Sequence, residues 1–457
     1  MPGLRDLPRH GKGDRLNRGP ISFGTDGVRG VANKGLLPED ALRLGLAASH
    51  VFGGRILVGR DTRLSGEMLV RALCAGAASG GAGVVDLGVL PTPGVAALAP
   101  RLGATAAGVV SASHNPYPDN GIKFFSGEGR KLSPEKEREI EDLLDRDVTR
   151  PTGSGIGRVE VLGDATRTYA QWVLRQLRPP AEGMEVLLDC ANGAAYEVAP
   201  LVFGETGADL TLTGTDPTGT NIIEGCGSTH IEELDASGHD VTFAFDGDAD
   251  RVLALDERGN VVDGDRIIAI LARDMKERGV LSGEVVVTVM SNLGFFKAME
   301  AMEIPYEVTD VGDRHVAEAM GKLRASLGGE QSGHVILARH TTTGDGIVTA
   351  LALLDVMVRS GKPLSELAAA MEVYPQTLIN VRLEEPTDAK AVASSETVRL
   401  AVSEAESILG EEGRVLLRPS GTEPVVRVMV EHTDETVCRR VCEEVSRTVQ
   451  DAGKEGT

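Results

Sequence analysis

The chain repeats one pattern of apolar and polar positions. A short apolar run rich in β-branched residues is followed by a glycine-rich polar loop and then by a stretch with helical spacing. The pattern begins at Arg55–Gly59, at Met184–Asp189 and at Glu284–Val289. Runs that are apolar throughout indicate strands buried on both faces, as in parallel sheets covered by helices. The chain therefore predicts three related α/β units.

The pattern changes from about Tyr374 onward. Apolar and polar residues alternate over residues 377–383, 414–418 and 425–431, and charged helical stretches lie between these runs. Such alternation is typical of strands with one exposed face, so we expect a smaller α+β domain here. Reorientation of a bound molecule by this domain would place a hinge near Tyr374.

The predicted organisation is four domains after an arm. The turn-rich segment Pro151–Gly157 (PTGSGIG) indicates one of the boundaries. The arm is basic and has no apolar stretch, so we interpret it as a flexible N-terminal arm and not a secretory leader. The expected boundaries are 1–20 for the arm, 21–158, 159–262 and 263–373 for the three α/β domains, and 374–457 for the α+β domain.

Composition excludes several classes of protein. The 457 residues carry a formal net charge of −21, and only 3% are aromatic, which disfavours a nucleic-acid-binding protein. No apolar run reaches the roughly 18 residues of a membrane span. The five cysteines are odd in number and scattered, so they do not form a disulfide scaffold. We expect a cytoplasmic protein that binds neither nucleic acid nor membrane.

The strongest chemical signal is the segment DGDADR, between two strand-like runs. Its carboxylates at Asp246, Asp248 and Asp250 alternate along the chain, and in extended backbone such positions project to one side. Three carboxylate oxygens favour a hard cation such as Mg²⁺. An EF-hand loop is disfavoured because its sixth position, which needs glycine, is Arg251, and the flanks are strand-like. A solvated acidic turn is the other alternative.

The second signal is SASHNP, which follows the strand-like run AAGVV and precedes DNGIK. Ser113 has His114 beside it and Lys123 nearby, a combination that activates a hydroxyl. The glycine-flanked serine of a hydrolase elbow is absent, so a phosphorylatable serine fits better. An ordinary serine turn is the alternative.

The third signal is RPSGTEP, between two predicted strands. A guanidinium, two hydroxyls and backbone N–H groups form a cradle for a phosphate dianion. The residues concerned are Arg418, Ser420, Gly421 and Thr422, with Arg427 as a second cation. A decorated hairpin turn is the alternative interpretation.

Two further loops are weak signals when taken alone. GEQSGH offers Glu330 and Ser332 to sugar hydroxyls, and FGTDGVRG places Arg29 in a glycine-rich turn. The sequence contains neither the phosphate loop of nucleotide hydrolases nor the dinucleotide-binding G-x-G-x-x-G, so nucleotide hydrolysis and nicotinamide chemistry are disfavoured.

These five loops, in this order, resemble the α-D-phosphohexomutase superfamily from about Ile21 to the C-terminus. The segments FGTDGVRG, GRDTRLSG, SASHNPYPDNGIKFF, DGDADR, GGEQSGH, TTTGDGI and RPSGTEP are similar to those of its bacterial phosphoglucosamine mutase branch. Gln331 favours that branch over phosphoglucomutases and phosphomannomutases, and the N-terminal arm departs from the usual start. The resemblance implies a mixed α/β, four-domain architecture around a central cleft.

The resemblance also implies a role for each matching residue. Ser113 is the phosphoserine; with Asp246, Asp248 and Asp250 it holds one Mg²⁺ per active site. Arg251 and Arg29 lie beside the transferred group, and Lys123 or His114 moves the proton. Glu330 and Ser332 bind the sugar, and Arg418, Ser420, Gly421, Thr422 and Arg427 bind the distal phosphate.

The implied substrate is a small phosphosugar, and the implied reaction interconverts glucosamine 6-phosphate and glucosamine 1-phosphate. A sugar 1,6-bisphosphate serves as intermediate and activator, and the product supplies UDP-N-acetylglucosamine synthesis. The alternatives are a phosphoglucomutase or phosphomannomutase with the same mechanism, a metal-dependent phosphatase and a non-catalytic phosphosugar sensor. A homodimer is compatible with the resemblance.

Two physical expectations follow for the site. A lysine base must be neutral, so Lys123 requires a lowered pKa to take the proton, and His114 is its rival. Arg29, Lys123, Arg251, Arg418 and Arg427 are expected to converge, forming a cationic island in an acidic protein.

Overall fold

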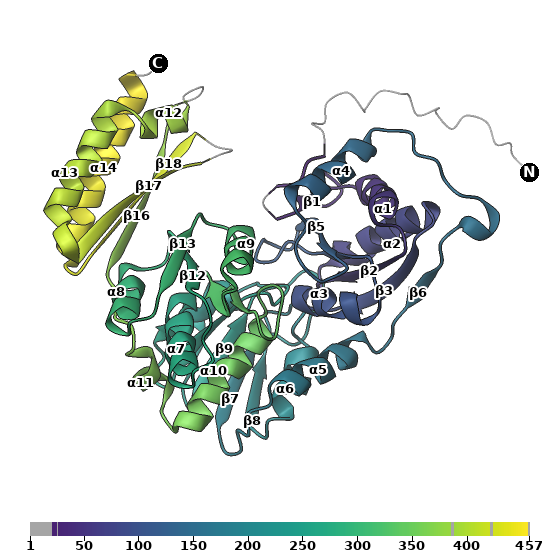
Figure 1. Cartoon of the computed structure of the whole chain (residues 1–457), viewed down its shortest axis with the longest axis horizontal. Helices are drawn as coiled ribbons and strands as arrows, with labels where there is room; N and C mark the ends of the chain where they lie inside the picture. The colour runs from purple at the N-terminus through teal and green to yellow at the C-terminus, as the bar shows by residue number, and fades with distance from the viewer. Residues whose placement is uncertain (1–20, 25, 385–387, 421–423, 456–457) are drawn as a thin grey trace, which may run out of the picture.

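The computed structural model describes residues 21–24, 26–384, 388–420 and 424–455. Its strands form four sheets, each with its own helices (Figure 1). None of the described helices is long and apolar enough to cross a membrane. All five cysteines are free and buried, which confirms the prediction that they do not form a disulfide scaffold.

The first sheet has the strand order β1-β5-β4-β2-β3-β6. Strands β2, β3, β4 and β6 are parallel, whereas β1 and β5 run antiparallel to their neighbours. Every residue of β4 is buried, as its uniformly apolar sequence predicts. The elements are β1 (Val28–Val31), α1 (Pro38–Phe52), β2 (Arg55–Arg60), α2 (Leu64–Ser79), β3 (Gly83–Val89), α3 (Thr92–Arg101), β4 (Ala106–Val110), β5 (Asp119–Ser126), α4 (Pro134–Leu144), η1 (Gly153–Gly155) and β6 (Val159–Val161).

The second sheet has the order β11-β10-β9-β7-β8. Strands β7, β8 and β9 are parallel, and β10 turns back antiparallel to β9 after the acidic loop. The elements are α5 (Ala165–Gln176), β7 (Glu185–Asp189), α6 (Val198–Gly204), β8 (Asp209–Thr213), η2 (Ser228–Glu233), β9 (Val241–Phe245), β10 (Val252–Asp256) and β11 (Val261–Val262).

The third sheet has the order β13-β12-β14-β15, with β12 parallel to both of its neighbours. Asp263 and Asn292 cap the helices α7 and α8 by accepting hydrogen bonds from backbone N–H groups of their first turns. The elements are α7 (Gly264–Glu277), β12 (Val285–Thr288), α8 (Leu293–Ala301), β13 (Tyr306–Thr309), α9 (Asp313–Leu323), β14 (Leu327–Gly329), β15 (Val335–Leu337), α10 (Gly346–Ser360) and α11 (Leu364–Ala368).

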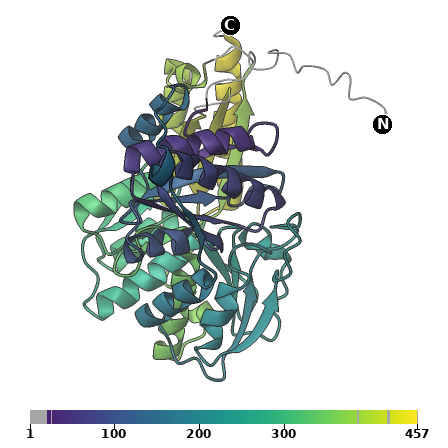
Figure 2. The ribbon, with the colours of Figure 1, turned by 90° about the vertical axis from the view of Figure 1, so that its right-hand side faces the viewer.

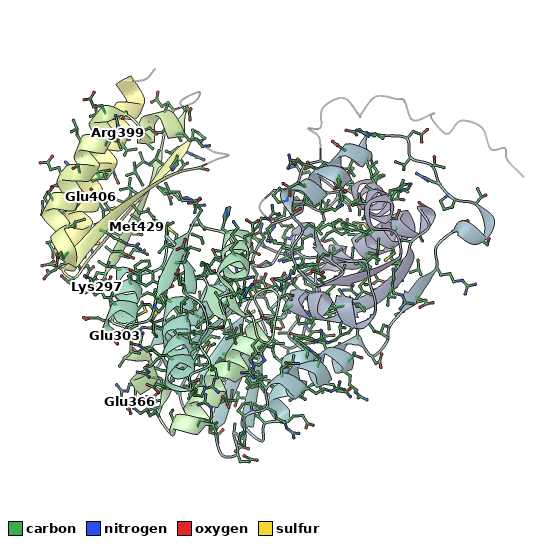
Figure 3. All side chains as sticks on the ribbon, in the orientation of Figure 1. Lys297, Glu303, Glu366, Arg399, Glu406 and Met429 are labelled. Carbon is green, nitrogen blue, oxygen red and sulfur yellow. The ribbon has the colours of Figure 1, made fainter. Side chains whose placement is uncertain are left out.

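The fourth sheet is antiparallel, with the order β16-β18-β17, as the alternating pattern predicts. Its elements are β16 (Gln376–Arg382), α12 (Ala389–Ala393), α13 (Glu396–Leu409), η3 (Gly410–Glu412), β17 (Gly413–Pro419), β18 (Val425–His432) and α14 (Glu435–Glu455). Figure 3 shows Arg399 and Glu406 on α13 and Met429 on β18.

The hydrophobic cores divide the molecule unequally. One continuous cluster runs through the first three sheets and includes Val95, Tyr169, Leu188 and Ile347. The fourth sheet has a separate core with its own helices. Figure 1 shows the fourth sheet standing apart from the first and beside the third, and in the turned view of Figure 2 it lies behind the first. The four-domain α/β architecture is thus three sheets with a shared core and a fourth that packs by itself. The exact domain boundaries stay a prediction; β6 pairs with the first sheet although it follows the predicted boundary at 158.

Candidate active site

The site is assembled at the ends of two buried strands. The loop after β4 carries Ser113, and the loop between β9 and β10 carries the three aspartates. Ser113 is 1% exposed, and its Oγ donates a hydrogen bond of 2.6 Å to Oδ2 of Asp246. Residues 133 positions apart in the sequence are thereby brought into direct contact.

The three aspartates form a compact carboxylate cluster. One oxygen from each of Asp246, Asp248 and Asp250 lies within 4.8 Å of the others, and all three residues are buried. The Oδ1 atoms of Asp248 and Asp250 are buried without a hydrogen-bond partner among the described residues. Buried carboxylate oxygens without partners are costly. The cluster is therefore suited to hold a divalent cation.

Charge repulsion within the cluster appears in the pKa values. Burial, together with Asp250 and Asp248, raises the pKa of Asp246 well above its ordinary value. Burial opposes ionisation of Asp250 as well, but Lys123 and His334 hold its pKa below the ordinary range. The negative charge is thus distributed unequally over the three carboxyl groups.

Lys123 enters the cluster from β5. Its Nζ donates to Oδ2 of Asp248 at 2.7 Å and lies 3.6 Å from Oδ2 of Asp250. Burial would lower the pKa of Lys123, but Asp248, Asp26 and Asp250 raise it above its ordinary value. The lowered pKa that a base role of Lys123 requires is therefore not met in this arrangement, because the carboxylates outweigh the desolvation of the ammonium group.

His114 lies on the other side of the serine. Its Nδ1 is 3.3 Å from Oγ of Ser113 and 3.3 Å from Nη1 of Arg251. Burial lowers the pKa of His114, and the cations Arg251 and Arg29 lower it further. The imidazole is consequently neutral at pH 7, with Nδ1 accepting from the guanidinium.

The two predicted active-site arginines are also present. The backbone N–H of Arg251 donates to Asp246 at 3.2 Å, and its Nε lies 3.7 Å from Asp250. Nη1 of Arg29 donates to the carbonyl of Ala112 and to Oδ1 of Asn115, each at 3.2 Å. Both guanidinium groups thus border the serine loop.

The loop predicted to bind the sugar, residues 329–334, lies near Arg251. Glu330, at the end of β14, is buried and accepts from the backbone N–H of Gly312 at 3.1 Å. Its charge contributes to raising the pKa of Arg251. Ser332 is exposed.

The described part of the phosphate loop belongs to the fourth sheet, whereas Ser113 follows a strand of the first sheet. Arg418 of β17 and Arg427 of β18 lie directly opposite each other in the fourth sheet. Ser420 follows β17, and Gly421 and Thr422 lie outside the described residues. Two like charges in a cross-strand pair repel, so this pair is suited to an anion. Convergence of these arginines with Ser113 stays a prediction.

Several residues of the site were not predicted from the sequence. Oγ1 of Thr92 donates to Asp248 at 2.5 Å, and Nδ1 of His334 lies 3.7 Å from Asp250. Nζ of Lys131 lies 2.9 Å from Oδ1 of Asp26, which precedes β1, and 2.6 Å from Oδ2 of Asp313 on α9. Lys131 thereby connects these two carboxylates. His334 and Asp26 lie inside the quoted motifs, so their place in a motif could have indicated them. Thr92 and Lys131 lie outside the motifs, and no sequence signal indicated them.

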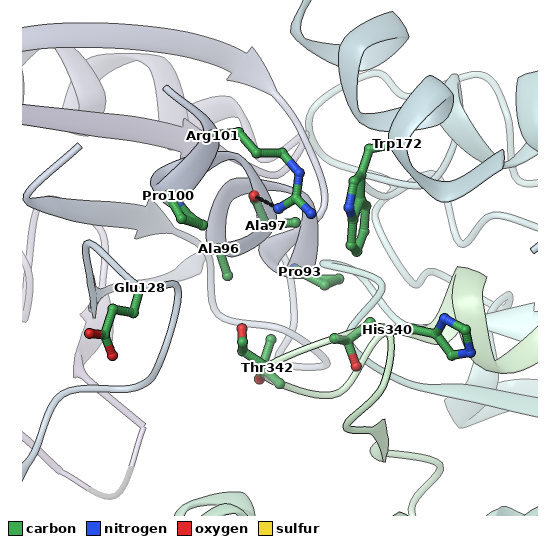
Figure 4. A pocket seen from close by; sticks show the side chains of 11 residues that line it. Pro93, Ala96, Ala97, Pro100, Arg101, Glu128, Trp172, His340 and Thr342 are labelled. Atoms are coloured by element: carbon green, nitrogen blue, oxygen red, sulfur yellow. Dashed lines mark hydrogen bonds between the residues drawn. The ribbon is translucent and has the colours of Figure 1, made fainter. Parts of the chain in front are cut away.

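A separate pocket of about 230 Å³ opens elsewhere, between α3, α5 and the segment 340–343 (Figure 4). Arg101 faces the ring of Trp172, with 4.5 Å from the guanidinium carbon to the ring centroid. None of the predicted site residues lines this pocket.

A buried serine set among carboxylates and cations on a scaffold of α/β sheets fits a phosphotransferase-type enzyme. Family models described as Phosphoglucomutase/phosphomannomutase match three parts of the chain: alpha/beta/alpha domain I at residues 20–150, alpha/beta/alpha domain III at 263–374, and the C-terminal domain at 378–448. The chain belongs to the phosphoglucomutase/phosphomannomutase family, within the α-D-phosphohexomutase superfamily.

Two curated relatives are similar along nearly the whole chain. A protein of Rubrobacter xylanophilus named phosphoglucosamine mutase is 70% identical over 437 residues, covering 95% of this chain and 98% of its own. One of Moorella thermoacetica with the same name is 52% identical over 425 residues, covering 90% and 95%.

Solved structures share the fold. A phosphoglucomutase/phosphomannomutase family protein of Burkholderia thailandensis superposes with a TM-score of 0.80 at 25% identity, covering 95% of this chain and 98% of its own. An Aspergillus fumigatus N-acetylphosphoglucosamine mutase, solved in complex with GlcNAc-6P and magnesium, gives 0.68 at 19% identity, covering 95% and 96%.

Proposed function

We propose that this enzyme interconverts glucosamine 6-phosphate and glucosamine 1-phosphate through a phosphorylated Ser113. One observation carries the chemistry: Oγ of Ser113 lies 2.6 Å from Asp246, inside a buried cluster of carboxylates and cations. The choice of an amino sugar rests on the names of the relatives, including one that is 70% identical over 437 residues.

The reaction consists of two phosphoryl transfers. In the first, the bond between phosphorus and Oγ of Ser113 breaks, and phosphorus bonds to a hydroxyl of the sugar phosphate, whose proton passes to a base. The product is a 1,6-bisphosphate. After reorientation, its other phosphoryl group returns to Oγ of Ser113, and the freed sugar oxygen takes a proton. The net result is isomerisation with no phosphate released.

The protein contributes position and charge to these steps. Arg251 contacts Asp246 and His114, which both border Ser113, and would stabilise negative charge on the transferred phosphoryl oxygens. Arg29 holds the carbonyl of Ala112 and thereby one side of the serine loop. Asp246, Asp248 and Asp250, with a phosphoserine oxygen, would hold Mg²⁺, and their oxygens without partners fit that ion. When bound, Mg²⁺ neutralises charge on the phosphoryl group.

The described arrangement bears on the choice of base. Lys123 is paired with carboxylates and therefore carries its proton, so it acts here as a hydrogen-bond donor. His114 is neutral and within 3.3 Å of Oγ of Ser113. We infer that His114 takes the proton once Nη1 of Arg251 no longer donates to its Nδ1. Lys123 takes that role only if its carboxylate partners are drawn away from it.

The remaining predicted residues complete the substrate site. Glu330 and Ser332 would bind sugar hydroxyls, and the pair Arg418 and Arg427 would bind the phosphate that is not being transferred, together with Ser420, Gly421 and Thr422. A sugar 1,6-bisphosphate would serve as activator by phosphorylating Ser113. We further propose the domain boundaries given above, a cytoplasmic location and a homodimer.

One coupled assay tests the specificity. The ratio kcat/KM is compared for glucosamine 6-phosphate, glucose 6-phosphate and mannose 6-phosphate, each with a catalytic amount of bisphosphate. The proposal predicts a preference for the amino sugar and no net release of inorganic phosphate. A large preference for glucose 6-phosphate would make the enzyme a phosphoglucomutase, and stoichiometric phosphate release would make it a phosphatase.

A further inference from the structure

One of the sequence segments that resemble the family has no role in the reaction described so far. The segment GRDTRLSG connects β2 to α2 and contains a fully buried ion pair between Asp61 and Arg63. Both side chains are 0% exposed. A buried guanidinium is costly unless all its N–H groups are bonded, so its partners indicate what it is for.

The partners of Arg63 are the backbone of the serine loop. Nη2 donates to the carbonyls of Ser113 at 2.8 Å and Asn115 at 2.7 Å. Nη1 donates to the carbonyls of Pro116 at 2.6 Å and Asp119 at 3.1 Å. Nε donates to Oδ2 of Asp61 at 2.8 Å, so all five N–H donors of the guanidinium are used. A lysine, with one compact ammonium, could not reach four carbonyls in this way.

The backbone held by Arg63 is strained. Ser113 has φ of 50°, in the left-handed region that side chains other than glycine rarely adopt. Such a conformation persists only where the surroundings determine it. On the opposite side of the loop, a Cβ built at Gly247 would lie 2.5 Å from the carbonyl oxygen of Ser113, so the acidic loop packs against the same carbonyl.

A second connection runs from the ion pair to the nucleophile. Oγ of Ser111 donates to Oδ2 of Asp61 at 2.6 Å and accepts from the backbone N–H of Ser113 at 3.0 Å. The amide and the carbonyl of Ser113 are therefore both tied to the pair of Asp61 and Arg63. This leaves the side chain as the free end, directed at Asp246.

We propose that Arg63 is a positioning residue that fixes the strained backbone of Ser113, so that Oγ and the phosphoryl group it carries face the acidic cluster. The inference rests on the proposed phosphoserine mechanism. Arg63 touches no reacting atom; it acts by clamping four carbonyls of the loop that presents the nucleophile. A misplacement of about 1 Å at the reacting atom costs on the order of 100-fold in rate.

The test uses Arg63→Lys, which keeps the charge beside Asp61 but loses the fork. Val58→Ala, a core truncation on the preceding strand β2, serves as the control for lost stability. We expect Arg63→Lys to lower kcat by about 100-fold while KM changes less than about threefold. Amide hydrogen exchange over residues 111–119 should accelerate in Arg63→Lys and not in Val58→Ala.

The outcomes separate the two claims. A kcat of Arg63→Lys within about threefold of the unaltered enzyme overturns the inference. A loss that Val58→Ala reproduces at equal Tm, or loop exchange that stays unchanged, overturns it as well. If Arg63→Lys does not fold, Ser111→Ala takes its place, because it removes the bond to the amide of Ser113. The exchange measurement needs no substrate, so failure of the proposed mutase activity and failure of the clamp are distinct results.

Discussion

Two arginine–carboxylate pairs, each with a buried carboxylate, make different connections within the enzyme. Arg63 and Asp61 lie within the first sheet's domain and hold one loop of that same domain. Arg414 and Glu431 lie in the fourth sheet and connect it to the third. Glu431 is 0% exposed and accepts from Nδ2 of Asn292 at 3.2 Å and from the backbone N–H of Leu293 at 2.9 Å, at the start of α8.

The different roles of these two pairs match the way in which the hydrophobic cores divide the molecule. The serine and the acidic cluster lie on sheets that share one hydrophobic cluster, so their relative position is fixed by packing. The arginines proposed to bind phosphate lie on a sheet with a separate core, attached through polar groups around Glu431. Ser113 and the acidic cluster thus belong to a rigid part with one shared core, whereas the proposed distal phosphate site belongs to a part that packs by itself.

Asp248→Asn is expected to have the largest effect, because it alters the rigid part. Loss of one cluster carboxylate should lower kcat by about 100-fold or more and weaken dependence on the divalent cation. Steady-state kinetics over a metal titration checks this. Asp274→Asn, which changes a buried, ion-paired aspartate of α7 away from the site, is the matched control. Equal metal dependence in Asp248→Asn and the unaltered enzyme would refute the assignment.

Arg418→Ala tests the fourth sheet. A charge-assisted contact to phosphate contributes about 1.5–3 kcal/mol, so KM should rise about tenfold or more. Arg399→Ala, at an exposed position on α13, should leave KM unchanged. An unchanged KM in Arg418→Ala would show that this pair does not bind the substrate phosphate.

Glu431→Gln tests the connection between the two parts. The substitution removes the charge that faces Arg414, whose Nε lies 2.6 Å away, and leaves the guanidinium with a poorer acceptor. We expect the fourth domain to unfold in a separate, earlier calorimetric transition and KM to rise severalfold. Glu406→Gln on α13 is the exposed control. A single transition at the original Tm would mean that Glu431 does not hold the domain.

Asp265→Asn should have the smallest effect on catalysis and should instead change the pH dependence of stability. Burial, with Asp263 nearby, raises the pKa of Asp265 from 3.8 to about 8, so the folded state keeps a proton that the unfolded state loses above pH 4. Stability should therefore fall as pH rises from about 4 to 8, by at most about 1.4 kcal/mol per pH unit. In Asp265→Asn, Tm should fall less over this range; an equal fall would contradict the assignment.

The sequence could predict the parts of the site that lie in contiguous motifs. Ser113 and Asp246 were predicted from local patterns and Arg251 from the family resemblance, and the structure brings all three together. The pKa direction of Lys123 could not be predicted, because it depends on carboxylates 125 and 127 positions away. Thr92 and Lys131 belong to no motif and meet the site only through packing of different sheets.

The fold shows the same division. Buried strands such as β4 and β7 could be predicted from their apolar runs, whereas β6 could not be assigned to the first sheet. Its residues are exposed and carry no periodic signal, so only the pairing with β3 identifies its sheet. The separate core of the fourth domain was indicated by the change to alternating strands.

The central claim is that Ser113 carries the phosphoryl group between substrate molecules. The most direct measurement is a single-turnover chase of enzyme labelled with ³²P from a sugar bisphosphate, using glucosamine 6-phosphate as acceptor and Ser113→Ala as the second sample. The account predicts that label on the unaltered enzyme maps to Ser113 and passes to the sugar at a rate compatible with kcat, and that Ser113→Ala neither takes up label nor turns over. Label at another residue, or normal turnover by Ser113→Ala, would contradict it.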